Sequence, residues 1–421
     1  MSIDATNLPL TETIEPAEQA AVAAAVQNAS ERQMAVYPLG GGTRLDYGAK
    51  PTRPGIGLSL AKLSRVVDYP AADLTITVET GTTIADLTKL LASQGQRLPI
   101  DIPQPDRATV GGAVAVNAAG SRRYAYGSMR DYLLGFTAVD GNGHLFSGGG
   151  RVVKNAAGYN MCRLMTGSLG TLGVLTQATL MVRPLAEASA LLVGDVSDFE
   201  MAEKLLAATV RSPTRPVAVD FVAGRLPAND QALGAVPEGH IGRLCVGFEG
   251  TAAEVAWMVE KLRDQWIATG STAPVLVSAA SAEPMWRWLA DFPADVQMSV
   301  LPSAVVASVA EIVRIDPACA IHAHAGDGVI RVSLPLPSGE GRGEGGASAA
   351  PVSFSAQPIS QLRAVAVAAG GKLVVLRHSD GVALTAADVW GPPGPETRLM
   401  QAIKERFDPN NILNPGRFSY C

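Results

Sequence analysis

The run Ala108-Thr-Val-Gly-Gly-Ala-Val-Ala-Val-Asn-Ala-Ala-Gly120 decides the fold of this chain. Two adjacent glycines, small residues throughout and one amide side chain allow its backbone to approach a flat, phosphate-bearing ligand closely. Taken alone, the run would suit a Gly/Ala-rich helix packed tightly against its neighbours just as well. Two further glycine-rich stretches, residues 37–45 and 167–175, favour the site of a large cofactor.

Six motifs follow one another along the chain in a defined order. They are Pro38-Leu-Gly-Gly-Gly-Thr43, Pro105-Asp-Arg-Ala-Thr-Val-Gly-Gly112, Asn117-Ala-Ala-Gly120, Tyr126-Gly127, Gly170-Thr-Leu-Gly-Val174 and Phe407-Asp-Pro-Asn-Asn-Ile-Leu-Asn-Pro-Gly-Arg-Phe418. In this order they resemble the FAD-binding domain of the vanillyl-alcohol oxidase/p-cresol methylhydroxylase (PCMH-type) superfamily. Within it, the chain is similar to the branch of 2-hydroxy-acid dehydrogenases, and in that branch to the group of E subunits of bacterial glycolate oxidase. The resemblance is strong over residues 30–185 and at the C-terminal motif.

The resemblance implies an α+β fold with two domains. A two-part PCMH-type FAD-binding domain would cover residues 1–185, an antiparallel-sheet cap domain with helices residues 186–395, and a C-terminal segment, 396–421, would return to the FAD domain. Because domains usually hold ~100–200 residues, the length of 421 residues also predicts more than one. Residues 336–353 contain hardly any core-forming side chain, which predicts a flexible surface loop inside the cap.

Hydrophobic periodicity predicts the elements of the first domain. Thr83 and Asp86 predict a capping box that opens a helix closed by Gly95, and Gly141-Asn-Gly143 predicts the turn of a hairpin. The same patterns predict a helix at 16–29, strands at 34–38 and 75–79, and the hairpin at 136–146.

A different pattern begins near residue 186. Strands are predicted at 191–194, 217–222 and 244–249, alternating with helices at 200–210 and around 255–262. Such units favour an antiparallel sheet backed by helices. Trp286 and Trp288 are more typical of core or interface packing than of a substrate cage, and they would anchor a partner if they lay on the surface.

Composition and charge exclude several classes of protein. The net charge is −5, and no Lys/Arg cluster or aromatic-interleaved basic stripe indicates a nucleic-acid partner. No stretch approaches the roughly 18–20 uninterrupted apolar residues that a spanning helix needs. The N-terminal segment lacks a basic part followed by an apolar core, so a secretory signal is not expected. We therefore expect a cytoplasmic protein, with at most peripheral contact, through partners, with the inner face of the cell membrane.

The four cysteines, Cys162, Cys245, Cys319 and Cys421, are widely spaced. This spacing excludes the C-x-x-C runs that hold iron–sulfur clusters or structural zinc. If the chain binds a flavin and passes on single electrons, the next carrier must therefore belong to another polypeptide.

The glycine-rich loops supply the expected cofactor site. Gly40, Gly41 and Gly42, followed by Thr43, offer consecutive N–H groups that can surround a pyrophosphate as an anion nest. No Gly-Lys-Ser/Thr follows, so this is not a P-loop, and the glycines at 141 and 143 do not open a helix as a dinucleotide fingerprint would. The resemblance implies FAD contacts from Pro38, Leu39, Gly40, Gly41, Gly42, Thr43, Arg44, Gly81, Pro105, Thr109, Gly111, Gly112, Asn117, Gly120, Gly127, Gly170, Gly173, Val174 and Asn414.

Two details of this site follow from the resemblance. Thr109 and Asn117 would hydrogen-bond flavin edges, while Gly170 and Gly173 would leave room for the ring or the adenine. Relatives with a covalent flavin attach it through a His or Cys in the early loops. The corresponding stretches here contain neither, so noncovalent FAD is expected. Arg123 and Asp131 would contact the cofactor-binding residues without touching FAD, or they would form a plain surface ion pair.

A second site is expected around Ile321-His-Ala-His-Ala-Gly-Asp-Gly-Val-Ile-Arg331. It resembles the family's His-x-Gly-Asp-Gly-Asn-x-His motif, whose histidines bind a divalent metal together with a Glu from a later Glu-His-Gly segment. His324 matches the first histidine, but Arg331 replaces the second and Arg377 replaces the Glu. A guanidinium has no lone pair to give a cation. The sequence therefore predicts no metal at this motif.

Two interpretations of this second site stay open. Arg331, Arg377, His324 and His378 would form a cationic pocket that clamps a small carboxylate, with a His accepting the hydroxyl proton. Alternatively, the site has decayed and these residues make structural hydrogen bonds.

Three functions are compatible with the sequence. The first, which the resemblance implies, is an FAD-binding subunit that oxidises glycolate, a 2-hydroxy acid, to glyoxylate within a glycolate oxidase complex. Its partners would be a larger FAD subunit with the complete metal motif and an iron–sulfur subunit that accepts the electrons. The second is a non-catalytic assembly subunit that retains the flavin fold, and the third is a stand-alone FAD-linked alcohol oxidase.

Overall fold

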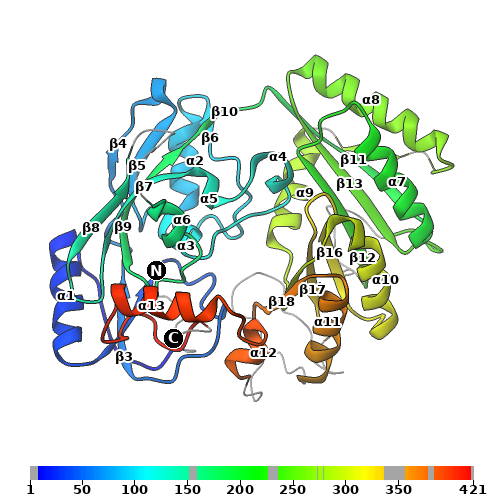
Figure 1. The fold of residues 1–421 in the computed structure, drawn as a ribbon. Coiled ribbons are helices and arrows are strands. Elements are labelled where there is room, and N and C mark those ends of the chain that lie inside the picture. Colours follow the sequence, from blue (N-terminus) through cyan, green and yellow to red (C-terminus); the bar gives the residue numbers. More distant parts are fainter. Residues whose placement is uncertain are drawn as a thin grey trace. The chain divides into compact units, whose positions relative to one another are not determined.

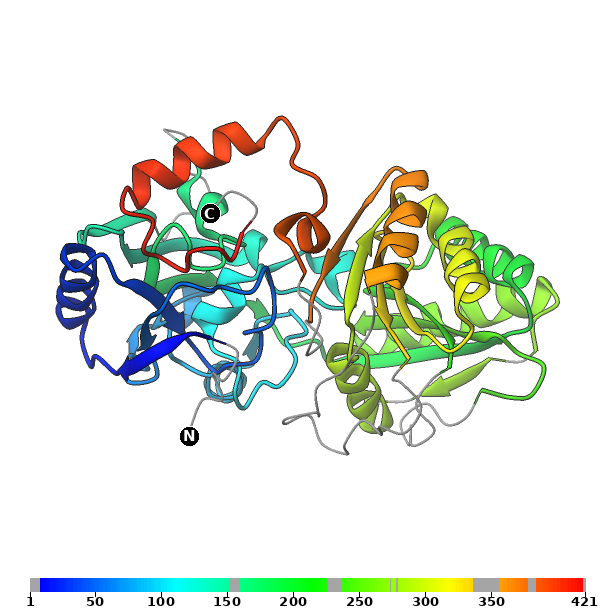
Figure 2. The ribbon, with the colours of Figure 1, turned by 90° about the horizontal axis from the view of Figure 1, so that it is seen from below.

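The computed structural model describes residues 8–150, 159–225, 236–272, 274–277, 279–335, 356–377 and 384–418. The chain forms two compact units with the expected α+β architecture (Figures 1 and 2). Unit 1 comprises Met1–Ala119, Ser128–Leu185 and Leu384–Cys421, and unit 2 comprises Gly120–Gly127 and Ala186–Ala383. These units differ from the expected boundaries in two places. Residues 120–127 group with unit 2 although they interrupt the FAD domain in sequence, and the chain returns to unit 1 at residue 384 rather than 396.

The described residues of unit 1 form three sheets. The parallel sheet β1-β3-β2 is formed by Leu10–Ile14, Gly55–Ser59 and Ala35–Leu39. The antiparallel sheet β4-β5-β9-β7-β8 is formed by Val66–Asp68, Thr75–Glu79, Val174–Met181, Leu133–Val139 and Leu145–Gly149. A short antiparallel pair joins β6 (Gln96–Arg97) to β10 (Arg183–Pro184).

Unit 1 also contains helices, several of which contact its strands. The helices are α1 (Gln19–Glu31), α2 (Ile84–Ala92), α3 (Val110–Ala115), α5 (Met129–Tyr132), α6 (Met161–Met165), α12 (Ala386–Trp390) and α13 (Thr397–Phe407), with a 3-10 turn at Ala71–Asp73. One apolar core joins Val22 and Val26 of α1 to Leu58 of β3 and to Ile412 and Leu413 near the C-terminus. The C-terminal segment, red in Figures 1 and 2, is therefore part of the first folding unit.

Several predictions of local structure are confirmed in unit 1. Strand β5 occupies residues 75–79 as predicted, and Thr83 caps α2 by accepting a hydrogen bond from the backbone N–H of Asp86. The helix buries one apolar face and is followed by Gly95 at φ +63°. Strands β7 and β8 form the predicted hairpin, with Val139 opposite Leu145.

Unit 2 is built on one antiparallel sheet of eight strands, which confirms the predicted cap architecture. Its order is β14-β11-β13-β12-β16-β17-β15-β18. The strands are β11 (Ala188–Val196), β12 (Ala218–Gly224), β13 (Gly242–Gly250), β14 (Val275–Val277), β15 (Val296–Ser299), β16 (Ala320–His324), β17 (Val329–Ser333) and β18 (Lys372–Val375). Its helices are α4 (Arg123–Tyr126), α7 (Phe199–Arg211), α8 (Ala252–Ala268), α9 (Ala279–Asp291), α10 (Val305–Ile315) and α11 (Ala356–Ala368), with a 3-10 turn at Pro302–Ala304.

The two faces of the large sheet carry different helices (Figure 1). Trp266 of α8 packs at Gly194 of β11, whereas α9 packs against Val193 and Cys245, which point to the opposite face because side chains alternate along a strand. Asp220 lies opposite Cys245 in the register and so shares the α9 face. This face carries the candidate site of unit 2.

Trp286 belongs to the core of unit 2, which confirms core packing as one of the two roles expected for it. Its ring is buried among residues of β11, β12 and β13, and the Arg122 guanidinium lies 4.0 Å from the ring centroid. The side chain is therefore no surface anchor for a partner. Trp288 is partly buried beside Phe292.

Some expectations lie outside the described residues. The flexible loop predicted at 336–353 falls in residues 336–355, and His378 falls in residues 378–383. Among the helices within the described ranges, none is long and apolar enough to cross a membrane.

Candidate functional site

The glycine-rich turn after β2 has the features of an anion nest. Gly42 adopts φ +72°, a conformation that favours glycine. Within the described part of the chain, the backbone N–H groups of Gly41, Gly42 and Thr43 donate no backbone hydrogen bond. Consecutive free N–H groups in such a turn suit a phosphate.

The glycines of this region let loops pack on one another. A Cβ atom on Gly41 would lie 1.6 Å from the carbonyl oxygen of Arg107, and one on Gly40 would lie 2.4 Å from the hydroxyl of Thr109. A Cβ on Gly81 would meet the Leu60 carbonyl oxygen at 2.0 Å. At these three positions the atoms that a side chain would meet belong to the protein.

Two asparagines assigned to the cofactor also hold loops in place. Asn117, at φ +50°, accepts a hydrogen bond from the Arg130 N–H at 3.0 Å. Asn414, at φ +43°, donates to the carbonyl of Leu169 at 2.7 Å. Backbone bonds from residues 167 and 169 to the carbonyls of Val114 and Ala115 attach the same loop to α3. The loops at 37–44, 80–83, 107–117, 167–173 and 411–414 therefore form one connected structure.

The other expected cofactor residues divide between the two units. Thr109 caps α3 by accepting a bond from the Gly112 N–H at 3.2 Å, and Pro38 lies within contact distance of the Cβ position of Gly170. Leu39 ends β2 and Val174 begins β9, while Arg44, Pro105, Gly111 and Gly173 lie in the loops or helix ends of unit 1. Gly120 and Gly127 instead belong to the segment that groups with unit 2.

Two polar groups near these loops were not predicted from the sequence. The hydroxyls of Ser59, at the end of β3 and opposite Leu39, and of Thr82, next to Gly81, are buried. In the described part of the structure neither has a hydrogen-bond partner. Because buried hydroxyls are normally paired, these two suit polar atoms of a ligand. Serine and threonine are too common in strands and turns for sequence alone to have singled them out.

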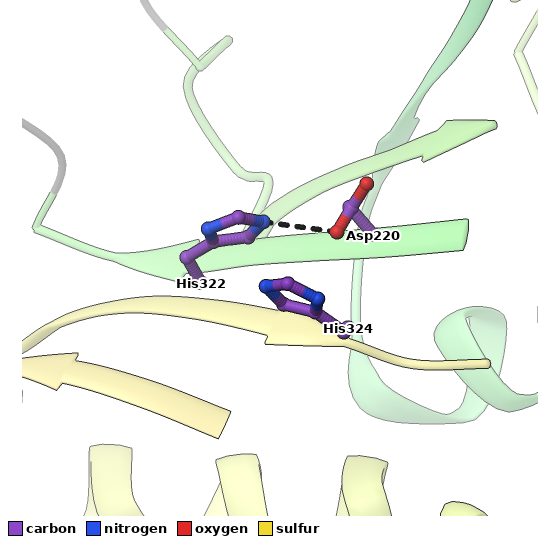
Figure 3. A group of neighbouring side chains, drawn as sticks. All are labelled: Asp220, His322 and His324. Atoms are coloured by element: carbon purple, nitrogen blue, oxygen red, sulfur yellow. Dashed lines mark hydrogen bonds and ion pairs between the residues drawn. The ribbon is translucent and has the colours of Figure 1, made fainter. Parts of the chain in front are cut away.

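A second polar cluster lies on the α9 face of the sheet in unit 2 (Figure 3). It consists of Asp220 from β12 and of His322 and His324 from β16, all three buried. His322 Nε2 and Asp220 Oδ1 are 2.9 Å apart, and the two imidazole rings are 4.8 Å apart between centroids. One ligand atom from each residue lies within 4.8 Å of the other two.

Burial determines the charge of His324 in this cluster. It lowers the pKa of His324 well below the usual value, and the Arg331 guanidinium and the His322 ring act in the same direction. His324 is therefore neutral near pH 7. Burial also raises the pKa of Asp327 to about 6, while its 3.5 Å ion pair with Arg123 acts in the opposite direction.

The four residues of the expected cationic pocket are not all brought together. Arg331 lies opposite His322 in the register of β16 and β17, close to the cluster. Arg377 follows β18, three strands from β16, and its guanidinium lies 4.0 Å from the Asp295 carboxylate. Neighbouring strands are about 4.8 Å apart, so the backbone of β18 lies roughly 14 Å across the sheet from that of β16. Arg123 pairs with Asp327, whereas Asp131 caps α5 through Ser128.

Comparison with known protein families decides the class of this chain. Residues 11–149 match the FAD binding domain family, and residues 185–418 match the family of FAD linked oxidases, C-terminal domain. The second match alone spans more than half of the chain. The chain belongs to the FAD-linked oxidases. FAD is its cofactor, and the protein is an FAD-dependent oxidoreductase.

Individual relatives of this FAD-linked oxidase differ in their sequence identity to it and in how much of each chain the match covers. It is 28% identical over 419 residues to the D-2-hydroxyglutarate dehydrogenase of Xanthomonas citri pv. viticola, covering 94% of this chain and 86% of that protein. Over 133 residues it is 43% identical to glycolate oxidase subunit GlcE of Escherichia coli (strain K12), covering 31% of this chain and 38% of that subunit. A structure of alkyldihydroxyacetonephosphate synthase matches with a TM-score of 0.70 at 18% identity, covering 96% of this chain and 75% of that one, which shows the shared fold.

Asp220 and His322 are the residues of the unit 2 site that sequence reasoning missed. The pattern His-x-His within a strand places both imidazoles on one face, because side chains alternate. Asp220 is the one charged residue in the apolar run 217–222, which is a second signal. Their proximity depends on the pairing of β12 with β16.

Proposed function

We propose that this FAD-linked oxidase is the FAD-binding subunit of a glycolate oxidase complex. In that role it contributes to the oxidation of glycolate, a 2-hydroxy acid, to glyoxylate and passes electrons to an iron–sulfur subunit. A larger flavin subunit with the complete metal motif would be the other partner. The local similarity of 43% to glycolate oxidase subunit GlcE is the observation that carries this proposal.

The residues of the chain support a role inside an assembly. Cys162, Cys245 and Cys319 are buried and well separated in sequence, so they offer no ligand set for an iron–sulfur cluster. A flavin can accept two electrons and release them singly, but the next one-electron carrier must then come from another chain. The cytoplasm, or the inner face of the cell membrane reached through partners, would be the place of such a complex.

FAD would be held without a covalent bond. Among the described residues of unit 1, the only imidazole and thiol are those of His144 and Cys162. His144 lies in the β7–β8 turn with 77% of its side chain exposed, and Cys162 is buried, where its thiol donates to the Leu134 carbonyl. Neither lies in a glycine-rich loop. When bound, FAD would supply the hydride-accepting chemistry of the oxidation, while Arg331 would hold the substrate carboxylate and a His of the same motif would take the hydroxyl proton.

A second candidate function is a stand-alone dehydrogenase for a 2-hydroxy acid. The similarity to the D-2-hydroxyglutarate dehydrogenase favours it, because that match covers 94% of this chain and 86% of the relative. The missing metal-motif ligands at positions 331 and 377 oppose it, since a guanidinium cannot replace them.

Reconstitution separates the two functions. The purified chain should show little glycolate-dependent dye reduction alone, and activity should appear when a metal-motif flavin subunit and an iron–sulfur subunit are added. Each partner alone and the pair without this chain are the controls. Robust turnover of glycolate or another 2-hydroxy acid by the isolated chain, unchanged by the partners, would refute the complex and support the second candidate.

A further inference from the structure

The polar cluster of Asp220, His322 and His324 has unused bonding capacity. Asp220 Oδ2 and His322 Nδ1 are buried without a hydrogen-bond partner among the described residues. The buried ring nitrogens of His324 make no hydrogen bond of normal geometry there, although the Gly120 backbone interacts weakly with this ring. The residues are 0%, 0% and 3% exposed. Because buried polar groups are normally paired, several such atoms in one place indicate a ligand.

The chemistry of these atoms selects a cation. Two imidazoles and one carboxylate are the donor set that zinc and related divalent ions prefer. Atoms bound to one zinc ion at about 2.0–2.1 Å lie about 3–4 Å from one another. One possible ligand atom from each of the three residues lies within 4.8 Å of the other two. Small side-chain rotations would therefore be enough to close the site around an ion.

We propose that Asp220, His322 and His324 bind a divalent transition-metal ion of the zinc class. The ligand set differs from the motif considered above, which shares only His324 with it. The arginines at positions 331 and 377, which argued against a metal there, replace none of these three ligands. The site is independent of the proposed subunit role, because it requires neither glycolate nor a partner.

The charges around the cluster partly oppose and partly support an ion. Arg331 lies opposite His322 in the register, so its positive charge would weaken the binding of a cation. The Asp220 carboxylate, 2.9 Å from the His322 ring, would favour the cation. The nearby Arg123 guanidinium is already paired with Asp327. Removing the charge of Arg331 should therefore strengthen the site.

Zinc binding to the isolated full chain tests the proposal. After treatment with chelator, equilibrium dialysis against micromolar zinc and elemental analysis should find one zinc per chain. His322→Gln, His324→Gln and Asp220→Asn should each weaken the zinc affinity by more than about tenfold. Loss of a residue that only hydrogen-bonds to a metal ligand already costs about 10–100-fold. Arg331→Gln should tighten it. His144→Gln, at the exposed turn of unit 1, is the matched control and should bind like the original chain.

Thermal unfolding keeps the test decisive if a variant folds poorly. Zinc should raise the Tm of the original chain and of His144→Gln, but not that of His322→Gln, which retains a polar side chain of similar size. Less than stoichiometric zinc in the original chain would overturn the proposal. So would zinc binding that persists in both His322→Gln and Asp220→Asn, since the ion would then be held elsewhere.

Discussion

The Nζ atom of Lys404 lies 2.5 Å from Oδ2 of Asp408, and both side chains are almost completely buried in unit 1. The same ammonium donates to the carbonyls of Thr171 and Leu413 at 2.8 and 2.9 Å. Asp408 also accepts from the backbone N–H groups of Ile412 and Leu413. One ion pair therefore joins α13 to the glycine-rich loop at 167–173 and to the C-terminal motif.

Replacing Lys404 should affect both stability and flavin binding. Lys404→Met leaves Asp408 buried without its partner, which should lower the free energy of unfolding by about 3 kcal/mol. FAD affinity should also fall, because the loop around Thr171 loses its anchor. Urea denaturation and flavin titration measure the two effects. Lys204→Met is the matched control, because Lys204 pairs with Glu200 at the same spacing on an exposed surface and should lose less than about 1 kcal/mol. Equal losses in the two variants would contradict the argument.

A second buried ion pair should stabilise unit 2. Arg122 donates to Glu249 at 2.7 Å, and the hydroxyl of Tyr126 donates to the same carboxylate at 3.0 Å. Glu249→Ala leaves a largely buried guanidinium, so we expect a loss of about 3 kcal/mol. Glu311→Ala breaks an exposed pair with Arg314 and should cost less than about 1 kcal/mol. Chemical denaturation followed by circular dichroism would show whether the two losses differ.

The glycine turn after β2 should tolerate no side chain at Gly41. The Cβ atom of Gly41→Ala would meet the Arg107 carbonyl at 1.6 Å, so the two loops must separate and FAD binding should be lost. Gly150→Ala is the control, since its Cβ would have nothing within 4 Å. The ratio of flavin to protein absorbance after purification reports the outcome. A Gly41→Ala protein that purifies with a full complement of FAD would show that the close packing of Gly41 on Arg107 is not needed for binding.

FAD should leave the protein when the chain is denatured with acid. The described glycine-rich loops contain no His or Cys, and the thiol of Cys162 is buried with a raised pKa. After precipitation with trichloroacetic acid, all flavin absorbance should appear in the supernatant. Yellow colour that stays with the washed precipitate would contradict a noncovalent cofactor.

Stability should fall at alkaline pH through Cys319. Burial, followed by the charges of Asp316 and Asp295, raises the pKa of this thiol to about 12. In the unfolded chain the thiol ionises near pH 8.5, so its contribution is complete below that pH and is lost as the pH rises toward 12. Between pH 8 and 10 this loss should be about 1–2 kcal/mol. Urea denaturation at both pH values should show a smaller decrease for Cys319→Ala. The same decrease in both proteins would assign the effect to other groups.

Local elements of this fold could be predicted because their signals lie within a few residues. The period-two pattern of β5 and the cap at Thr83 need only neighbouring side chains and backbone. The β7–β8 hairpin likewise follows from the turn glycines. The ordered glycine-rich motifs were sufficient for the cofactor class as well, which the family matches confirm.

The sequence by itself determined the flavin class, the α+β architecture and several of the strands and helices. Only the tertiary structure decided which residues meet. The pairing of β12 with β16 brings Asp220 to His322 across 102 residues of sequence, and the same sheet keeps Arg377 three strands from His324. The pattern of a single strand shows which face a side chain occupies. Strand order and register depend on the packing of the whole sheet, so the neighbours of that side chain could not be predicted from the pattern.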